Sequence, residues 1–303
     1  MSARGWLAFL AISLLWGIPY LFIRVAVDGG LPPLFLAWSR VTLAALVVGA
    51  MAWRAGVLPT VRGRLRWLLV YGAIEIAMPF PLIAAGERHV ASSLAAIIVA
   101  AVPLIVTALT LRVAPRERVR GRRLAGLIAG FAGVIALVGI DVGRSGAALL
   151  GAGAILLAAA GFAIGLLVLD RHLRDLDPRA AMATALAFAA VALTPFAALS
   201  AGPRHPSSAA LIALAVLVVP CTAGALLVYA ILVAEAGAAR AAVINYIVPL
   251  VAVGLGAAAL GEHLRATAIA GLLLILIGSW FATDGRLPPQ ARVARAHRVP
   301  TDR

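Results

Sequence analysis

Residues 90–111 read VASSLAAIIVAAVPLIVTALTL, a run of 22 residues without a single charged side chain. An α-helix rises about 1.5 Å per residue, so a run of this length crosses the roughly 30 Å hydrocarbon core of a bilayer. Comparable apolar runs recur along the chain, and we count ten of them: 6–26, 34–53, 67–86, 90–111, 121–140, 147–169, 180–200, 209–234, 239–260 and 265–283. The sequence therefore predicts an all-α integral membrane protein with ten transmembrane helices.

The composition supports a membrane protein and excludes several kinds of site. Of the 303 residues, 63% are apolar and 13% are charged, whereas a soluble domain carries about 25% charged residues. The chain has no lysine, which excludes a Walker-type phosphate loop and any Schiff-base lysine. A single cysteine, Cys221, excludes an intrachain disulfide and cysteine-based metal sites. The five histidines lack metal-ligand spacing, so neither a cofactor nor a metal is expected.

The positions of the arginines predict the orientation, because loops that stay in the cytoplasm are rich in basic residues. With the N-terminus inside, twenty arginines fall in cytoplasmic segments and four fall in outer loops, namely Arg88, Arg144, Arg204 and Arg265. We therefore expect a multi-pass protein of the plasma (bacterial inner) membrane with both termini in the cytoplasm. The positive charge orients the helices, so no nucleic acid partner is expected. Residues 285–303 are predicted to form a basic, disordered cytoplasmic tail.

The two halves of the chain resemble each other at an offset of about 145 residues. Pro103-Leu104 in the fourth run matches Pro249-Leu250 in the ninth, and a pair of glycines in the fifth run matches a pair in the tenth. We predict one repeat in residues 1–140 and a second in 141–284, with five helices each. Because five is odd, the copies must be inverted in the membrane, as in secondary transporters that work by alternating access.

The matching prolines are predicted to break their helices. Proline removes a backbone hydrogen bond and frees a carbonyl, which a membrane helix tolerates where it meets protein or a water-filled cavity. Matching breaks at Pro103 and Pro249 point to a binding site between the repeats. The alternative is that each proline only kinks its helix for packing. The spaced glycines Gly126 and Gly130 are interpreted as positions of close helix packing, so a homodimer is not indicated.

Several short motifs that occur in both halves of the chain resemble, in their residues and in their order, those of the EamA-type transporters of the drug/metabolite transporter superfamily. They are Trp16-Gly17 with Arg24, Trp38-Ser39-Arg40, residues 90–96 followed by Pro103, and Pro249 followed by Leu260-Gly261-Glu262-His263-Leu264. The resemblance extends from Trp6 to about Thr283. It implies a ten-helix carrier that moves small metabolites or drugs, often outward, without ATP. The second half departs from it, with Ala185 where Arg40 would repeat.

Ionisable side chains inside a membrane are costly and mark candidate functional sites. Glu75 lies near the middle of the third run, with Tyr71 one turn before it on the same face. We predict that Glu75 carries a proton or meets a cationic group of the substrate; the alternative is a fixed structural ion pair. Arg40 in the second run is the predicted partner, either of Glu75 or of a substrate carboxylate. Its alternative role is to stabilise the bundle.

Two further groups are candidates for the wall of the cavity. Trp16, Tyr20 and Arg24 are spaced four residues apart, so they form one stripe along their helix. The alternative for Arg24 is that it reaches the outer headgroups, and the alternative for the two aromatic residues is that they only pack against neighbouring helices. Asn245 and Tyr246 precede Pro249 by one turn, and Thr222 and Tyr229 follow Pro220. These four are predicted to supply neutral hydrogen bonds to a mostly apolar pocket, or otherwise to bond helix to helix.

The predicted function is secondary transport of a small amphipathic molecule. The cargo is expected to be amino-acid-like or a drug-like organic cation, moved outward by alternating access. No ATP-binding element exists in the sequence, so the driving force is a gradient of the substrate or of protons. The alternative is a membrane-embedded enzyme or sensor that transports nothing, because catalytic partners need not be close in sequence.

Overall fold

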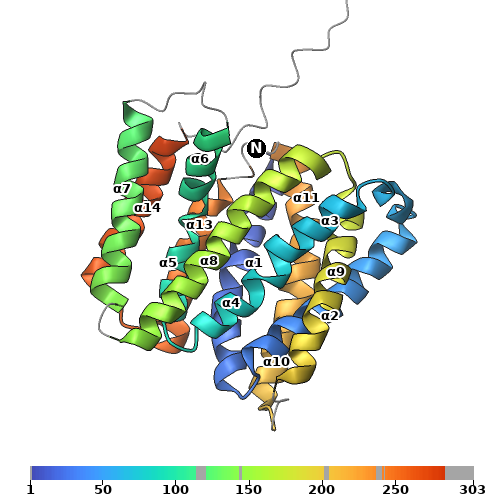
Figure 1. The fold of residues 1–303 in the computed structure, drawn as a ribbon, viewed down its shortest axis with the longest axis horizontal. Helices are drawn as coiled ribbons and strands as arrows, with labels where there is room; N and C mark the ends of the chain where they lie inside the picture. The colour runs from blue at the N-terminus through green and yellow to red at the C-terminus, as the bar shows by residue number, and fades with distance from the viewer. Residues whose placement is uncertain are drawn as a thin grey trace, which may run out of the picture.

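The computed structural model describes residues 2–113, 121–142, 145–200, 205–236, 241 and 243–283. All regular secondary structure in these ranges is helical (Figure 1). Part of the arginine-rich loop (114–120), the predicted tail (285–303), Arg144, Arg204 and Arg240 lie outside the described residues.

The first half of the chain forms three helices that are nearly straight and two that are interrupted. Its elements are α1 (Ala3–Asp28), α2 (Pro33–Arg54), η1 (Leu58–Val61), α3 (Leu65–Tyr71), η2 (Gly72–Ala77), α4 (Pro79–Gly86), α5 (Ser92–Val99), α6 (Val102–Val113), α7 (Arg122–Ala136) and η3 (Leu137–Val142). The second half contains α8 (Gly146–Val168), η4 (Leu169–Leu173), α9 (Pro178–Leu199), α10 (Ser208–Val218), η5 (Val219–Gly224), α11 (Ala225–Ala236), α13 (Ile244–Leu260) and α14 (Ala266–Ala282).

Within the described ranges, eight helical segments are long and apolar enough to cross a membrane, and they coincide with the first eight predicted runs. The prediction of an all-helical, multi-pass chain is confirmed. In place of the ninth and tenth runs lie two apolar helices of 17 residues each, α13 and α14. At about 1.5 Å per residue each is about 25 Å long, so the count of ten spans stays a prediction.

The two halves are packed into each other along the whole bundle. Helices α7 and α14 form a pair at one edge, and α2 pairs with α9 at the opposite edge (Figure 1). Between these pairs, α1 packs against α13, α10 and α11, while α8 packs against α4, α5 and α6. Each of these contacts joins one half to the other, so the interior of the bundle is lined by both.

The predicted helix break occurs at one of the two prolines. Helix α5 ends at Val99 and α6 begins at Val102, so the fourth run is interrupted immediately before Pro103. Helix α13, by contrast, continues through Pro249, and the break predicted there is wrong. Pro249 is the sixth residue of α13, so it removes the hydrogen bond to the carbonyl of residue 245, and a membrane helix continues through such a proline where neighbouring elements satisfy the freed carbonyl.

Two other interruptions occupy equivalent places in the two halves. The π-helical turns η2 in the third run and η5 in the eighth lie 147 residues apart in the chain. Pro79 begins the helix that follows the first π-turn, and Pro220 lies in the second π-turn. Because proline has no N–H, the regular pattern of backbone hydrogen bonds must shift at both prolines. Such turns insert one extra residue and often occur at functional sites. Here they carry Glu75 and Thr222 at matching positions.

Candidate functional site

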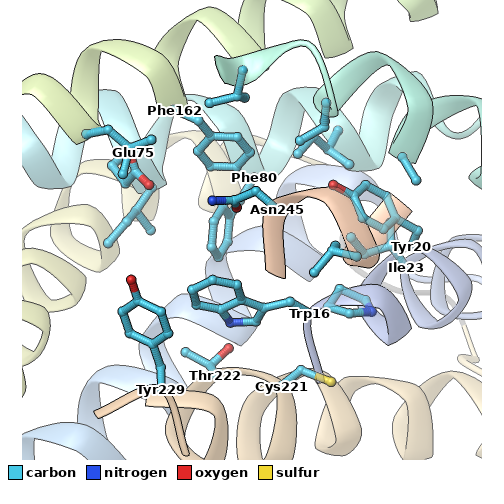
Figure 2. A pocket seen from close by; sticks show the side chains of 18 of the residues that line it. Trp16, Tyr20, Ile23, Glu75, Phe80, Phe162, Cys221, Thr222, Tyr229 and Asn245 are labelled. Atoms are coloured by element: carbon cyan, nitrogen blue, oxygen red, sulfur yellow. The ribbon is translucent and has the colours of Figure 1, made fainter. Parts of the chain in front are cut away.

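A cavity of about 340 Å³ lies inside the bundle (Figure 2). This volume falls in the range of roughly 300–1,000 Å³ that is usual for small-molecule sites. Its wall is mainly apolar and aromatic, and both halves contribute to it. Ten of the twelve predicted site residues line it: Trp16, Tyr20, Arg40, Tyr71, Glu75, Pro103, Thr222, Tyr229, Asn245 and Pro249.

Glu75 is the acidic side chain of the cavity wall. It lies on η2, against α8, and its Oε2 is buried without a hydrogen-bond partner. The carboxyl group occupies space that is open only because residue 165 is glycine, since a Cβ there would collide with Glu75 Oε2. A buried carboxylate without a partner is strongly unfavourable, so this group needs a proton or a cationic ligand.

Arg40 is the basic side chain of the wall, and its contacts differ from those predicted. Its guanidinium lies 4.5 Å from the centre of the Phe80 ring, and its Nη2 is 3.5 Å from Thr222 Oγ1. Its Nε is buried without a partner. Among the described residues no ion pair joins Arg40 to Glu75, so the predicted pair is not formed. Arg40 is held over the ring instead, and each charged group keeps an unpartnered polar atom.

Aromatic rings fill the space between these charged groups. Trp16 and Tyr229 lie with ring centroids 5.1 Å apart and planes inclined by 31°. In the view of Figure 2, Glu75 and Phe162 lie in the upper part and Thr222 near the bottom, with the rings of Phe80 and Trp16 at intermediate heights. Phe80 and Phe162 were not predicted from the sequence. The cavity thus combines flat apolar surfaces with one acidic and one basic group.

Two predicted residues lie elsewhere. Arg24 is one turn beyond the cavity and ties the end of α1 to the chain after α4: its Nε is 2.7 Å from Asp28 Oδ2, and its Nη1 donates to the carbonyl oxygens of Glu87 (2.5 Å) and Val90 (3.3 Å). Arg24 is therefore not part of the cavity wall, and its hydrogen bonds join α1 to the chain after α4.

Tyr246 is next to Asn245 and therefore points about 100° away around the helix. Its hydroxyl is 3.2 Å from Thr283 Oγ1, and its ring meets the Trp280 ring edge-on at 5.9 Å. Tyr246 thus bonds α13 to the end of α14, which corrects its predicted place in the pocket.

Polar side chains gather at the end of the bundle where α1 ends and α5 begins, which we call the Glu262 end. A second hollow of about 400 Å³ lies here, lined by Arg24, Asp28, Arg88, His89, Val90, Ala91, Leu260 and Glu262. Glu262, from the second half, caps α5 of the first half. It accepts hydrogen bonds from Ser92 N (2.8 Å), Ser92 Oγ (2.9 Å) and Ser93 N (3.0 Å). The cap satisfies amide groups that a helix start leaves unpaired.

Removing this cap is expected to weaken the joint between the halves. Burial acts to raise the pKa of the Glu262 carboxyl, but the hydrogen bonds from Ser93 and Ser92 outweigh it, so the pKa is lowered. The stabilisation is therefore present at neutral pH and is lost as the pH falls through this lowered pKa. We expect Glu262→Gln to cost about 1–2 kcal/mol, because an amide NH₂ cannot accept from a helix N–H.

The measurement is thermal unfolding of purified protein between acid and neutral pH, with Asp175→Asn as a control. Asp175 pairs with Arg64 at 3.0 Å on the surface, where such pairs contribute little. A Glu262→Gln variant as stable as wild type at neutral pH would contradict the capping role.

In the part of the chain that the structure describes, no group of three His, Cys, Asp or Glu side chains is placed to hold a metal ion.

Comparison with known proteins identifies a family, a similar curated protein and a similar solved structure. The sequence model of the EamA-like transporter family matches residues 3–139 and 149–283. Protein PagO of Salmonella typhimurium is 36% identical over 99 residues, a match that spans 32% of either chain. A solved crystal structure superposes with a TM-score of 0.65 at 19% identity, covering 93% of this chain and 97% of the other, which shows the fold alone.

Proposed function

The chain belongs to the EamA-like transporter family, and from this premise we propose that it is a secondary carrier for a small amphipathic molecule that bears an amine. The observation that carries the proposal is the Glu75 carboxyl, whose Oε2 is buried without a hydrogen-bond partner, in the wall of a cavity that Trp16, Tyr229 and Phe162 also line. A protonated amine on the cargo neutralises this carboxylate, while aromatic faces attract cations and cover apolar groups. In the empty carrier a proton takes the same place, which couples transport to a proton gradient.

Arg40 favours an amino-acid-like cargo over a simple organic cation. Arg40 lines the same cavity as Glu75, its Nε is buried without a partner, and the two side chains are not paired with each other. A zwitterion satisfies both groups at once, with its amine on Glu75 and its carboxylate on the guanidinium fork of Arg40. An organic cation satisfies only Glu75.

The proposed mechanism is alternating access between two inverted repeats of five helices, in residues 1–140 and 141–284. The contacts of α1 and α8 with helices of the opposite half support it, as do the π-turns at matching positions in the third and eighth runs. Such an arrangement provides two equivalent packings of the same elements. No step of this mechanism needs a reaction of the cargo, so we propose a carrier and not an enzyme.

The proposed setting is a plasma (bacterial inner) membrane with both termini and the tail 285–303 in the cytoplasm. The basic cytoplasmic loops of the sequence support this orientation. Because α1 crosses the membrane once from Ala3 to Asp28, the Glu262 end then faces outward. We propose export as the direction of net transport, with the bilayer and protons as the only other partners.

The experiment is counterflow of labelled compounds in proteoliposomes, with and without a pH gradient. The panel holds amino acids, their decarboxylated amines and aromatic quaternary ammonium compounds. Saturable exchange of amino acids that accelerates with unlabelled cargo on the far side supports the proposal. A flat panel on folded protein contradicts it and favours an enzyme or sensor.

Replacing Arg40 tests the assignment of the cargo's carboxylate. We expect Arg40→Gln to lower exchange of amino acids by about 10- to 100-fold, because a charge-assisted hydrogen bond in a buried site contributes about 1.5–3 kcal/mol. Exchange of the decarboxylated amines should change by less than about threefold. The matched control is Arg54→Gln, at the exposed end of the same helix. Equal losses for both classes of compound would contradict the assignment.

A further inference from the structure

Glu87 is a second buried acid, separate from the cavity, whose carboxyl lacks any hydrogen bond. It directly follows α4 and its side chain is 0% exposed. Its backbone is fully used, since its N–H donates to Ile83 O at 2.9 Å and its carbonyl accepts from Arg24 Nη1. Neither Oε1 nor Oε2 has a partner. The chain therefore encloses a carboxyl group that nothing in the fold satisfies.

This carboxyl lies between the cavity and the hollow at the Glu262 end. The charged groups that face it are Arg24 and Asp28 of α1, Arg40 of α2 and Glu262 of the loop before α14, and it also acts on the Tyr20 hydroxyl. Arg24, Asp28 and Glu262 line the hollow, whereas Arg40 and Tyr20 line the cavity. On its own loop, Arg88 and His89 are exposed and line the hollow. Glu87 is thus part of the layer that separates the two spaces.

The balance of these neighbours favours the neutral acid. Burial raises the pKa of Glu87 well above its usual range. Arg24 and Arg40 act to lower this pKa, while the carboxylates of Glu262 and Asp28 add to the increase. The nearest cation, Arg24, is already committed to Asp28 and to two carbonyl groups. An ionised carboxylate in this place would lose its hydration without compensation.

We propose that Glu87 is a proton-binding site that keeps the Glu262 end of the carrier closed, so that this end opens when the proton leaves. The inference rests on the proposed function, because opening of this end is one half of alternating access. On opening, the carboxylic O–H bond breaks and the proton passes to water that enters the hollow. The carboxylate that remains is then hydrated and is free to pair with Arg24.

The sign of the pH effect follows from the two environments. In the open state water surrounds Glu87 and its pKa is ordinary; in the closed state burial raises it. Below the ordinary pKa both states hold the proton and the closed state carries no penalty. At a pH between these two pKa values, opening releases one proton. Each unit of rising pH therefore increases the ratio of the open to the closed population by up to about tenfold.

The test is a distance measurement that needs no substrate. Spin labels are attached to cysteines at the exposed positions Arg88 and His263, which belong to opposite halves, in a Cys221→Ser background in lipid nanodiscs. We expect one short distance at low pH and a growing population of longer distances as the pH rises. In Glu87→Gln, which mimics the protonated acid, the short distance should persist at every pH. Glu87→Asp, which can still release a proton, should keep the response.

Glu235→Gln is the matched control, because it removes a carboxylate that lines neither the cavity nor the hollow and accepts a hydrogen bond from Ser2 Oγ, so it should leave the pH response of the distance intact. The infrared band of a protonated carboxyl, recorded at neutral pH, should lose intensity in Glu87→Gln. An unchanged distance in wild type, a response that persists in Glu87→Gln, or no change in that band would overturn the proposal. Failure of counterflow with an intact Glu87 response would instead refute the proposed cargo transport alone.

Discussion

Glutamine in place of Glu75 is expected to reduce amine-dependent exchange by roughly 30- to 150-fold and to abolish its dependence on a pH gradient. The loss corresponds to about 2–3 kcal/mol, a modest value for removing one partner of a buried charge pair. The physical reason is that the amide has the shape of the protonated acid but binds neither a proton nor an ammonium group strongly. Among the described residues, it also removes the only acidic side chain in the wall of the cavity.

The stability of this variant separates a binding role from a structural one. Glu75 Oε2 has no partner in the fold, so a neutral amide should leave thermal stability unchanged or raise it. A matched control is Glu235→Gln, a carboxylate near the N-terminus that accepts from Ser2 Oγ at 2.6 Å and approaches Arg4 at 3.9 Å. It should transport like wild type. Wild-type rates and unchanged pH dependence in Glu75→Gln would remove Glu75 from the mechanism.

Alanine in place of Gly278 is expected to separate α14 from α7 and to lower the stability of the protein by about 1–3 kcal/mol or more. A Cβ at this position would lie 2.5 Å from the backbone nitrogen of Gly130 and 2.6 Å from the carbonyl oxygen of Gly126. Backbone atoms in a helix cannot turn aside as a flexible side chain can, so the two helices must move apart. Overpacking of this kind typically costs about 1–3 kcal/mol.

Gly254 of α13 offers the matched control, because it is exposed and nothing lies within 4 Å of an added Cβ. Gly254→Ala should be neutral, or stabilising by up to about 1 kcal/mol, since alanine favours the helix. The measurement is the midpoint of thermal unfolding in detergent for both variants beside wild type. Equal midpoints for Gly278→Ala and Gly254→Ala would show that α7 and α14 are not held by this close approach.

The membrane-spanning helices were predictable because their signal is local and additive. A run such as 90–111 needs only its own composition to reveal that it prefers lipid to water. The close packing at Gly126 and Gly130 was likewise predictable from spacing along one helix, and the structure confirms it. The prediction failed at Pro249, because a membrane helix can continue through a proline where neighbouring elements satisfy the freed carbonyl, and those neighbours are not visible in the sequence of one helix.

The candidate site was predictable only where residue type alone was informative. Glu75 and Arg40 are recognisable because a charge inside a membrane is costly wherever it points. Phe80 was missed because a regular α-helix would place it about 140° around the axis from Glu75, on another face. The π-turn η2 inserts an extra residue between them, so both line the cavity. The local sequence pattern does not predict this change in the direction of the Phe80 side chain.

The sequence by itself determined that the chain is helical and lies in a membrane, that it contains a repeat, and that a few polar groups are enclosed within it, because these properties depend on composition and on spacing along single helices. The tertiary structure alone decided which of those groups share a space. It placed Arg40 over Phe80 and left Glu75 unpaired. It also turned Tyr246 towards α14 and enclosed Glu87 between two hollows. These outcomes depend on the distances between helices that are far apart in the chain. The packing of the two halves against each other determines those distances.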